Sequence, residues 1–76
     1  MDELKIGKYR HFKGREYLVL GIGRHSETME EFVVYKALYD SPDFGKNALW
    51  LRPKAMFLEK TVKGGKEIPR FEFVSD

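Results

Sequence analysis

Aromatic rings and guanidinium groups are the side chains of this sequence whose types favour a binding site. The amphipathic rings are those of Tyr9, Tyr17, Tyr35, Tyr39 and Trp50, and the interspersed planar cations are those of Arg10, Arg24, Arg52 and Arg70. Rings beside arginine can stack nucleic-acid bases or hold a peptide, and arginine offers forked donors to an anionic group. Trp50 and Arg52 are two residues apart in a β-prone segment, so we expect both on one face of a strand.

Histidines and carboxylates form a second candidate group, made of His11, His25, Glu27 and Glu30. Two histidines and one carboxylate could bind a metal ion if they converged on one point. The sequence has no cysteine and no H-E-x-x-H motif, so we favour hydrogen-bonded structural histidines and predict no metal site. Ser26 follows His25 directly, and neighbours on a strand point to opposite faces, which disfavours a nucleophilic pair.

The size of the chain limits what such a site can be. Seventy-six residues make one small domain with a thin core, so we predict a single domain over 1–76 with its core at about 7–74. The net charge of +2 does not by itself indicate a nucleic-acid-binding protein. The absence of cysteine excludes disulfides, and the absence of an export signal or a long apolar run leads us to expect a cytoplasmic protein without membrane association.

Six short strands must position these side chains. We expect them over residues 8–13, 17–24, 32–39, 48–52, 58–62 and 67–74.

Turn chemistry separates the expected strands. A helical or 3₁₀ turn is expected after Pro53, a hairpin turn at Gly64-Gly65, and a loop over 40–47. Residues 25–31 form a connection in which Thr28 and Glu31 match a helix capping box. Gly21 and Gly23 indicate a bend of the kind that a small closed barrel requires.

The predicted fold is mostly β: a small SH3-like antiparallel barrel of five or six short strands with one short helical or 3₁₀ turn. The alternative is an open α+β sheet, for which the sequence contains too little helix.

Several motifs in a fixed order are similar to those of one protein family. They are Tyr9-Arg10-His11-Phe12-Lys13-Gly14, His25-Ser26-Glu27-Thr28, Val33-Val34-Tyr35, Leu49-Trp50-Leu51-Arg52-Pro53 and Pro69-Arg70-Phe71. Together they resemble DUF1653, a small bacterial family of unknown function, from about Gly7 to Val74. The resemblance implies a short cytoplasmic protein with a compact, SH3-like β fold. It implies no established activity, ligand or catalytic residue.

We therefore predict a non-catalytic binding module for a peptide, a nucleic acid or a small anionic ligand. The predicted site residues are Arg10, His11, His25, Glu27, Tyr35, Trp50, Arg52 and Arg70. No catalytic residue, metal ion or cofactor is assigned. The polar members of this set could instead form a structural hydrogen-bond network.

The alternative function is a small metal-dependent or acid/base enzyme centred on His11, His25 and Glu27. The predicted partner is an unknown protein, peptide or nucleic acid. The chain itself is expected to be a monomer or a weak homodimer that pairs through a sheet edge.

Overall fold

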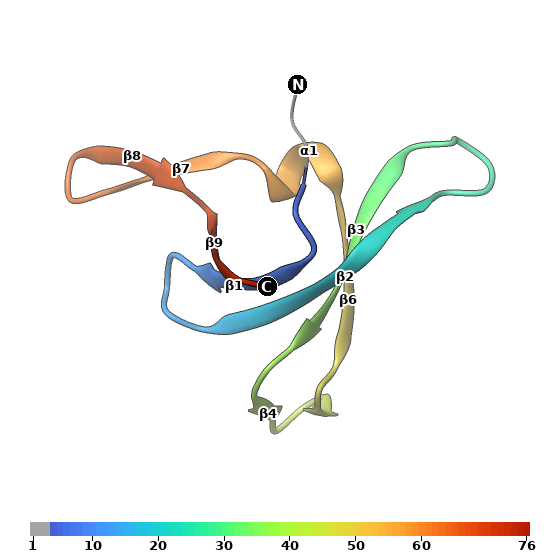
Figure 1. Ribbon diagram of the computed structural model, residues 1–76, viewed down its shortest axis with the longest axis horizontal. Helices are drawn as coiled ribbons and strands as arrows, with labels where there is room; N and C mark the ends of the chain where they lie inside the picture. The colour runs from blue at the N-terminus through green and yellow to red at the C-terminus, as the bar shows by residue number, and fades with distance from the viewer. Residues whose placement is uncertain (1–3) are drawn as a thin grey trace.

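The computed structural model describes residues 4–76 and is almost entirely β-structure (Figure 1). The elements in chain order are β1 (Gly7–His11), β2 (Glu16–Arg24), β3 (Glu31–Ala37), β4 (Asp40–Ser41), β5 (Gly45–Lys46), β6 (Leu49–Pro53), α1 (Lys54–Phe57), β7 (Lys60–Lys63), β8 (Lys66–Pro69) and β9 (Phe71–Ser75). Five of the strands form one antiparallel sheet in the order β6-β3-β2-β1-β9, and β4-β5 and β7-β8 form separate hairpins.

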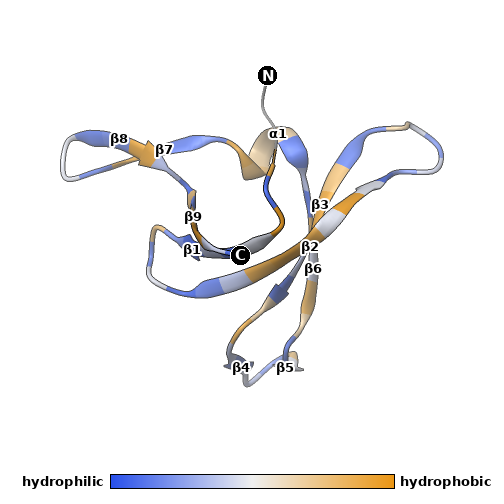
Figure 2. Cartoon of the chain, viewed as in Figure 1, coloured by the Kyte–Doolittle hydropathy of each residue, from blue (hydrophilic) through white to orange (hydrophobic). Residues whose placement is uncertain are grey.

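Alternation along the central strands divides the sheet into an inner and an outer face. In β3, Val33, Tyr35 and Ala37 are buried, while the residues between them are half-buried. The pairing between β2 and β3 shifts between Val19 and Gly21, which is a β-bulge at the position where the glycines predicted a bend. Figure 2 shows hydrophobic segments along β2, β3 and β6, whereas the β7–β8 hairpin is mostly hydrophilic.

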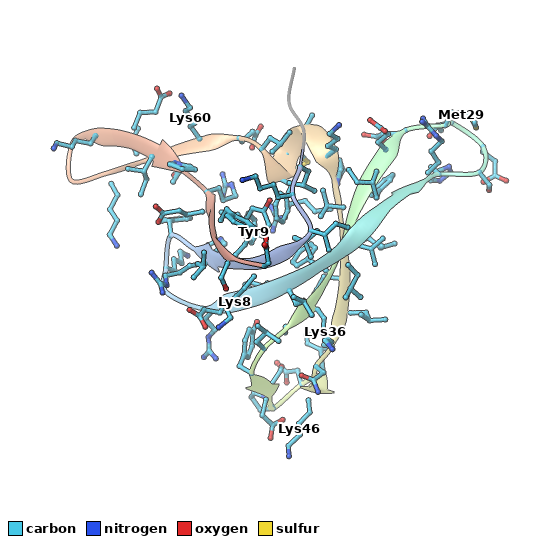
Figure 3. The ribbon with its side chains drawn as sticks, viewed as in Figure 1. Lys8, Tyr9, Met29, Lys36, Lys46 and Lys60 are labelled. Atoms are coloured by element: carbon cyan, nitrogen blue, oxygen red, sulfur yellow. The ribbon has the colours of Figure 1, made fainter. Side chains whose placement is uncertain are left out.

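The core lies on the inner face, under the single turn of α1. Phe57 of α1 is 1% exposed, and its ring stacks on that of Phe71 in β9 with the centroids 4.1 Å apart. The rings of Tyr9 and Tyr35 pack edge-on against Phe57 at 5.5 and 5.4 Å. Figure 3 places Tyr9 in this interior, between the sheet and α1. The expected helical turn after Pro53 is therefore confirmed, and it anchors β9 to β3.

Three hairpin arms extend from this core in different directions (Figure 1). They are the connection between β2 and β3, the β4–β5 hairpin and the β7–β8 hairpin. The third arm turns at Gly64 and Gly65, which both have positive φ, as the sequence predicts for a hairpin turn.

The predicted closed barrel is wrong, because the five-stranded sheet is open. Neither β6 nor β9 has a second neighbour in that sheet, so its two ends are not hydrogen-bonded to each other. The gap between them is bridged by side chains, with Phe57 of α1 packed on Phe71. Closure of a barrel requires every strand to pair on both sides.

Three local predictions also need correction. The strand expected over 67–74 is two strands in different sheets, because Pro69 offers no N–H and Arg70 N–H donates to the Glu59 carbonyl oxygen at 3.1 Å. The predicted 40–47 loop contains β4 and β5. The possible helical turn beginning at Thr28 is a plain turn, in which Thr28 Oγ1 accepts the Glu30 N–H at 3.2 Å.

No helix in residues 4–76 has both the length and the apolar character needed to cross a membrane.

Candidate ligand-binding site

A pocket of about 270 Å³ lies on the inner face, and we call it the aromatic pocket. Its lining residues are Tyr17, Tyr35, Tyr39, Trp50 and Arg52. Three of these, Tyr35, Trp50 and Arg52, belong to the predicted site, and the structure brings them together.

The register of the sheet explains why these side chains meet. Tyr35 of β3 lies directly opposite Trp50 of β6, and Val33 lies opposite Arg52, so both β6 side chains project from the inner face. Tyr17 of β2 lies opposite Ala37, whose small side chain leaves space above it. The expectation that Trp50 and Arg52 share a face is therefore confirmed.

Hydrogen bonds fix the polar tips in the aromatic pocket. The hydroxyl oxygens of Tyr17 and Tyr39 are 2.9 Å apart, and Arg52 Nε donates to the Tyr35 hydroxyl oxygen at 3.3 Å. Burial raises the pKa of Tyr17 above its ordinary value of 10.0, and the hydrogen bond to Tyr39 raises it further. Tyr17 is therefore a neutral hydrogen-bonding group at physiological pH.

Two guanidinium groups make the aromatic pocket electropositive. Arg52 lines it, and the Arg15 guanidinium lies over the Tyr39 ring, 4.3 Å from its centroid. Neither arginine forms an ion pair with a carboxylate of residues 4–76. The described lining offers rings and donors but contains no carboxylate, histidine or serine.

A second pocket of about 370 Å³, which we call the basic pocket, contains two more of the predicted residues. Its ionisable lining residues are Arg10, His11, Lys13, Lys63 and Glu72. Arg10 Nη2 donates to Glu16 Oε2 at 3.1 Å in an exposed ion pair.

Arg70 lies beside the basic pocket. Its guanidinium carbon is 5.8 Å from the centroid of the Phe12 ring, which lines that pocket. Its Nη2 is 3.8 Å from Glu59 Oε1, and its buried Nε has no acceptor among residues 4–76.

His11 lines the basic pocket. Its ring packs edge-on against Phe71, with the centroids 4.9 Å apart. Burial lowers the pKa of His11 from its ordinary value of 6.5, and the charges of Arg52, Arg70 and Lys13 lower it further. The imidazole is therefore held in its neutral form, surrounded by cations from three segments.

His25 and Glu27 are not part of either cluster, because they occupy the tip of the β2–β3 arm. His25 Nδ1 accepts the backbone N–H of Glu27 at 3.2 Å and that of Thr28 at 3.3 Å, which closes the turn. Met29, labelled near this tip in Figure 3, has a positive φ of 65°. No group of three histidine, aspartate or glutamate side chains in residues 4–76 is placed to bind a metal ion. The structure does not bring His11, His25 and Glu27 together.

The predicted site lacks several residues that line the pockets. Tyr17 and Tyr39 are among the amphipathic rings of the sequence, and alternation from Tyr35 places Tyr39 on the same face. Lys63 gave no usable signal, because it reaches the basic pocket from a hairpin whose direction depends on the tertiary fold.

Comparison with known proteins identifies the family. A family model described as a protein of unknown function, DUF1653, matches residues 7–73. The chain belongs to the DUF1653 family. The family resemblance inferred from the motifs is thereby confirmed, over nearly the range expected.

One solved structure shares the fold of this DUF1653 chain. The crystal structure of a DUF1653 protein from Bordetella bronchiseptica superposes with a TM-score of 0.84 and 36% sequence identity. The match covers 95% of this chain and 88% of the Bordetella chain. None of the curated protein sequences matches.

Proposed function

We propose that this DUF1653 protein is a non-catalytic binding module whose aromatic pocket holds a flat, negatively charged ligand. The observation that carries the proposal is the joint lining of one hollow by Trp50, three tyrosines and Arg52. Flat rings provide stacking surfaces, and a guanidinium offers paired donors to a carboxylate or phosphate.

The charge of the pocket selects among the ligand classes that the sequence leaves open. A cationic peptide would be repelled, because Arg52 lines the pocket and Arg15 lies over Tyr39. The same groups attract an anion, and the tyrosine hydroxyls can donate hydrogen bonds to it. The lining residues that the structure describes include no carboxylate or imidazole that could act as a base, which favours binding over catalysis.

The scaffold for this site is, in our proposal, an open relative of the SH3-like barrel. The strand order supports it, since the last strand pairs with the first and the other three follow as a meander. A short helical turn before the closing strands gives further support.

Trp50 provides a direct test, because it is the sole tryptophan and its fluorescence reports on the aromatic pocket. The probes are orotate, benzoate and uridine 5′-monophosphate, which are flat rings carrying an anionic group. We expect saturable quenching by at least one of them. Substitution Arg52→Met should weaken this binding by about tenfold or more, because it removes a charged hydrogen bond.

Matched variants separate binding from loss of structure. Arg24→Met removes the same charge from the β2–β3 arm and should bind like the wild type. Arg52→Lys keeps the charge but not the planar fork, so it should bind with intermediate affinity, and urea unfolding verifies that each variant is folded. The proposal fails if no probe perturbs Trp50, or if Arg24→Met weakens binding as much as Arg52→Met.

A further inference from the structure

Segments that are far apart in the sequence contact one another around the basic pocket. Lys63 Nζ, from the β7–β8 arm, donates to the Phe12 carbonyl oxygen at 3.2 Å. The Phe12 N–H in turn donates to the Arg70 carbonyl oxygen at 2.9 Å. These bonds link the β7–β8 arm and the residue before β9 to the turn that joins β1 and β2, and the basic pocket lies among these segments.

The described lining of the basic pocket contains more cationic side chains than carboxylates. Lys13 and Lys63 form no ion pair with any carboxylate of residues 4–76. Glu72 is the single carboxylate in the described lining. The Phe12 ring has the Lys13 ammonium and the Arg70 guanidinium each 5.8 Å from its centroid, so further cations gather here.

Residues that line the two pockets pack on one buried ring. Phe71 packs against Tyr17 and Tyr35 of the aromatic pocket, with centroids 5.8 and 5.7 Å apart, and against His11 of the basic pocket at 4.9 Å. The Arg52 guanidinium lies over the same ring, 5.5 Å from its centroid. Arg52 of the aromatic pocket and His11 of the basic pocket therefore form the junction between the two linings.

A stacking surface followed by unpaired cations matches a polymer that carries flat rings on an anionic backbone. Single-stranded nucleic acid has this composition, and its binding proteins combine aromatic platforms with a positively charged groove. An acidic peptide would satisfy the lysines but would leave the ring faces without a stacking partner. A duplex hides its base faces inside the helix.

We propose that the aromatic and basic pockets together bind single-stranded nucleic acid, with a base in the first pocket and a backbone phosphate in the second. This inference rests on the proposed function and extends it to a ligand class and to a second subsite. Lys13 and Lys63 are the phosphate-binding residues, and Arg52 lies at the junction.

Fluorescence anisotropy with a labelled oligouridylate of about ten nucleotides tests the inference, at about 50 mM and about 200 mM salt. We expect the oligonucleotide to bind more tightly than uridine 5′-monophosphate. The double variant Lys13→Gln/Lys63→Gln should weaken oligonucleotide binding by about tenfold at the lower salt concentration. It should also reduce the slope of log affinity against log salt by about 1.4, since each single-strand phosphate contact contributes about 0.7.

The matched control is Lys36→Gln/Lys46→Gln, which removes the same charge from β3 and from the β4–β5 arm (Figure 3); neither lysine lines the aromatic or the basic pocket. It should bind within about twofold of the wild type, with a nearly unchanged salt slope. Equal weakening by the two double variants would overturn the inference. So would binding of a duplex or of oligoglutamate as tight as that of the oligouridylate.

The two proposals fail in different ways. If uridine 5′-monophosphate quenches Trp50 but the oligonucleotide binds no more tightly, the second subsite is excluded while the proposed function stands. If neither the oligonucleotide nor any of the three small probes affects Trp50, both proposals are wrong.

Discussion

Burial and neighbouring cations lower the pKa of His11. Its ring is packed on Phe71, and its cationic neighbours Arg52, Arg70 and Lys13 oppose protonation. The folded protein therefore takes up this proton at a lower pH than the unfolded chain does. Any anion bound in the basic pocket would approach a neutral imidazole.

The lowered pKa of His11 predicts acid destabilisation. Its contribution to stability is complete above the unfolded-state pKa of about 6.5 and is lost as the pH falls through the folded-state pKa. Urea unfolding from about pH 7.5 to about pH 5 should show a smaller loss of unfolding free energy in His11→Gln than in the wild type. His25→Gln is the control and should follow the wild type, because His11 is still present. An unchanged pH dependence in His11→Gln would refute this assignment.

Residue types and spacing were sufficient to predict part of the candidate site. Trp50 and Arg52 share a face because side chains alternate along a strand, and this rule needs no tertiary information. Alternation along a strand says nothing about whether His25 lies near His11. Such a contact would require the tip of the β2–β3 arm to fold back towards β1, and the structure shows that it does not (Figure 1). Lys63 was missed because alternation does not give the direction of the β7–β8 arm either.

At the scale of elements, Gly7 allows the close approach of β9 to β1. It has a positive φ of 147°, and a Cβ added there would lie 2.5 Å from the Ser75 carbonyl oxygen. L side chains rarely adopt this backbone conformation, and the oxygen belongs to the main chain of the paired strand.

Gly7→Ala should therefore destabilise the protein by about 1–3 kcal/mol, as measured by urea unfolding. The control is Gly21→Ala, since no atom lies within 4 Å of the Cβ that it would add and its φ is not positive. That variant should change stability by less than about 1 kcal/mol. Equal effects of the two substitutions would show that the approach of β9 does not depend on Gly7.

Elements that depend on local sequence patterns were predicted well, whereas the pairing of strands with one another was not. The turn after Pro53 and the Gly64-Gly65 hairpin depend on backbone preferences of a few residues, and both occur as expected. The segment 67–74 is divided in two at Pro69 and Arg70. Pro69 is a local signal of interrupted pairing, whereas no local pattern encodes the hydrogen bond from the Arg70 N–H to the Glu59 carbonyl oxygen.

At the scale of the whole molecule, an open sheet and a closed barrel share the same strands and turns. They differ in whether β6 and β9 meet, and that depends on long-range packing rather than on strand propensity. In this chain the packing of Phe57 on Phe71 joins the two ends of the sheet without backbone pairing. The sequence therefore predicted the β class and most strand positions, but not β4 and β5, the division of 67–74 or the open sheet.

The open sheet also has a functional consequence in our account. Its inner face is filled by aromatic residues near α1, and farther from α1 it leaves the aromatic pocket accessible from solvent. The β7–β8 arm adds the lysine that extends this surface into the basic pocket. The proposed ligand binding therefore depends on how the arms and the sheet are assembled.

Backbone chemical-shift mapping with the oligouridylate tests most directly whether the aromatic and basic pockets together bind single-stranded nucleic acid. We expect saturable changes in the amide signals of residues 11–14, 39, 50–52 and 63, with small changes at 25–28 on the β2–β3 arm. Changes concentrated at 25–28, or spread over all exposed lysines alike, would contradict the account.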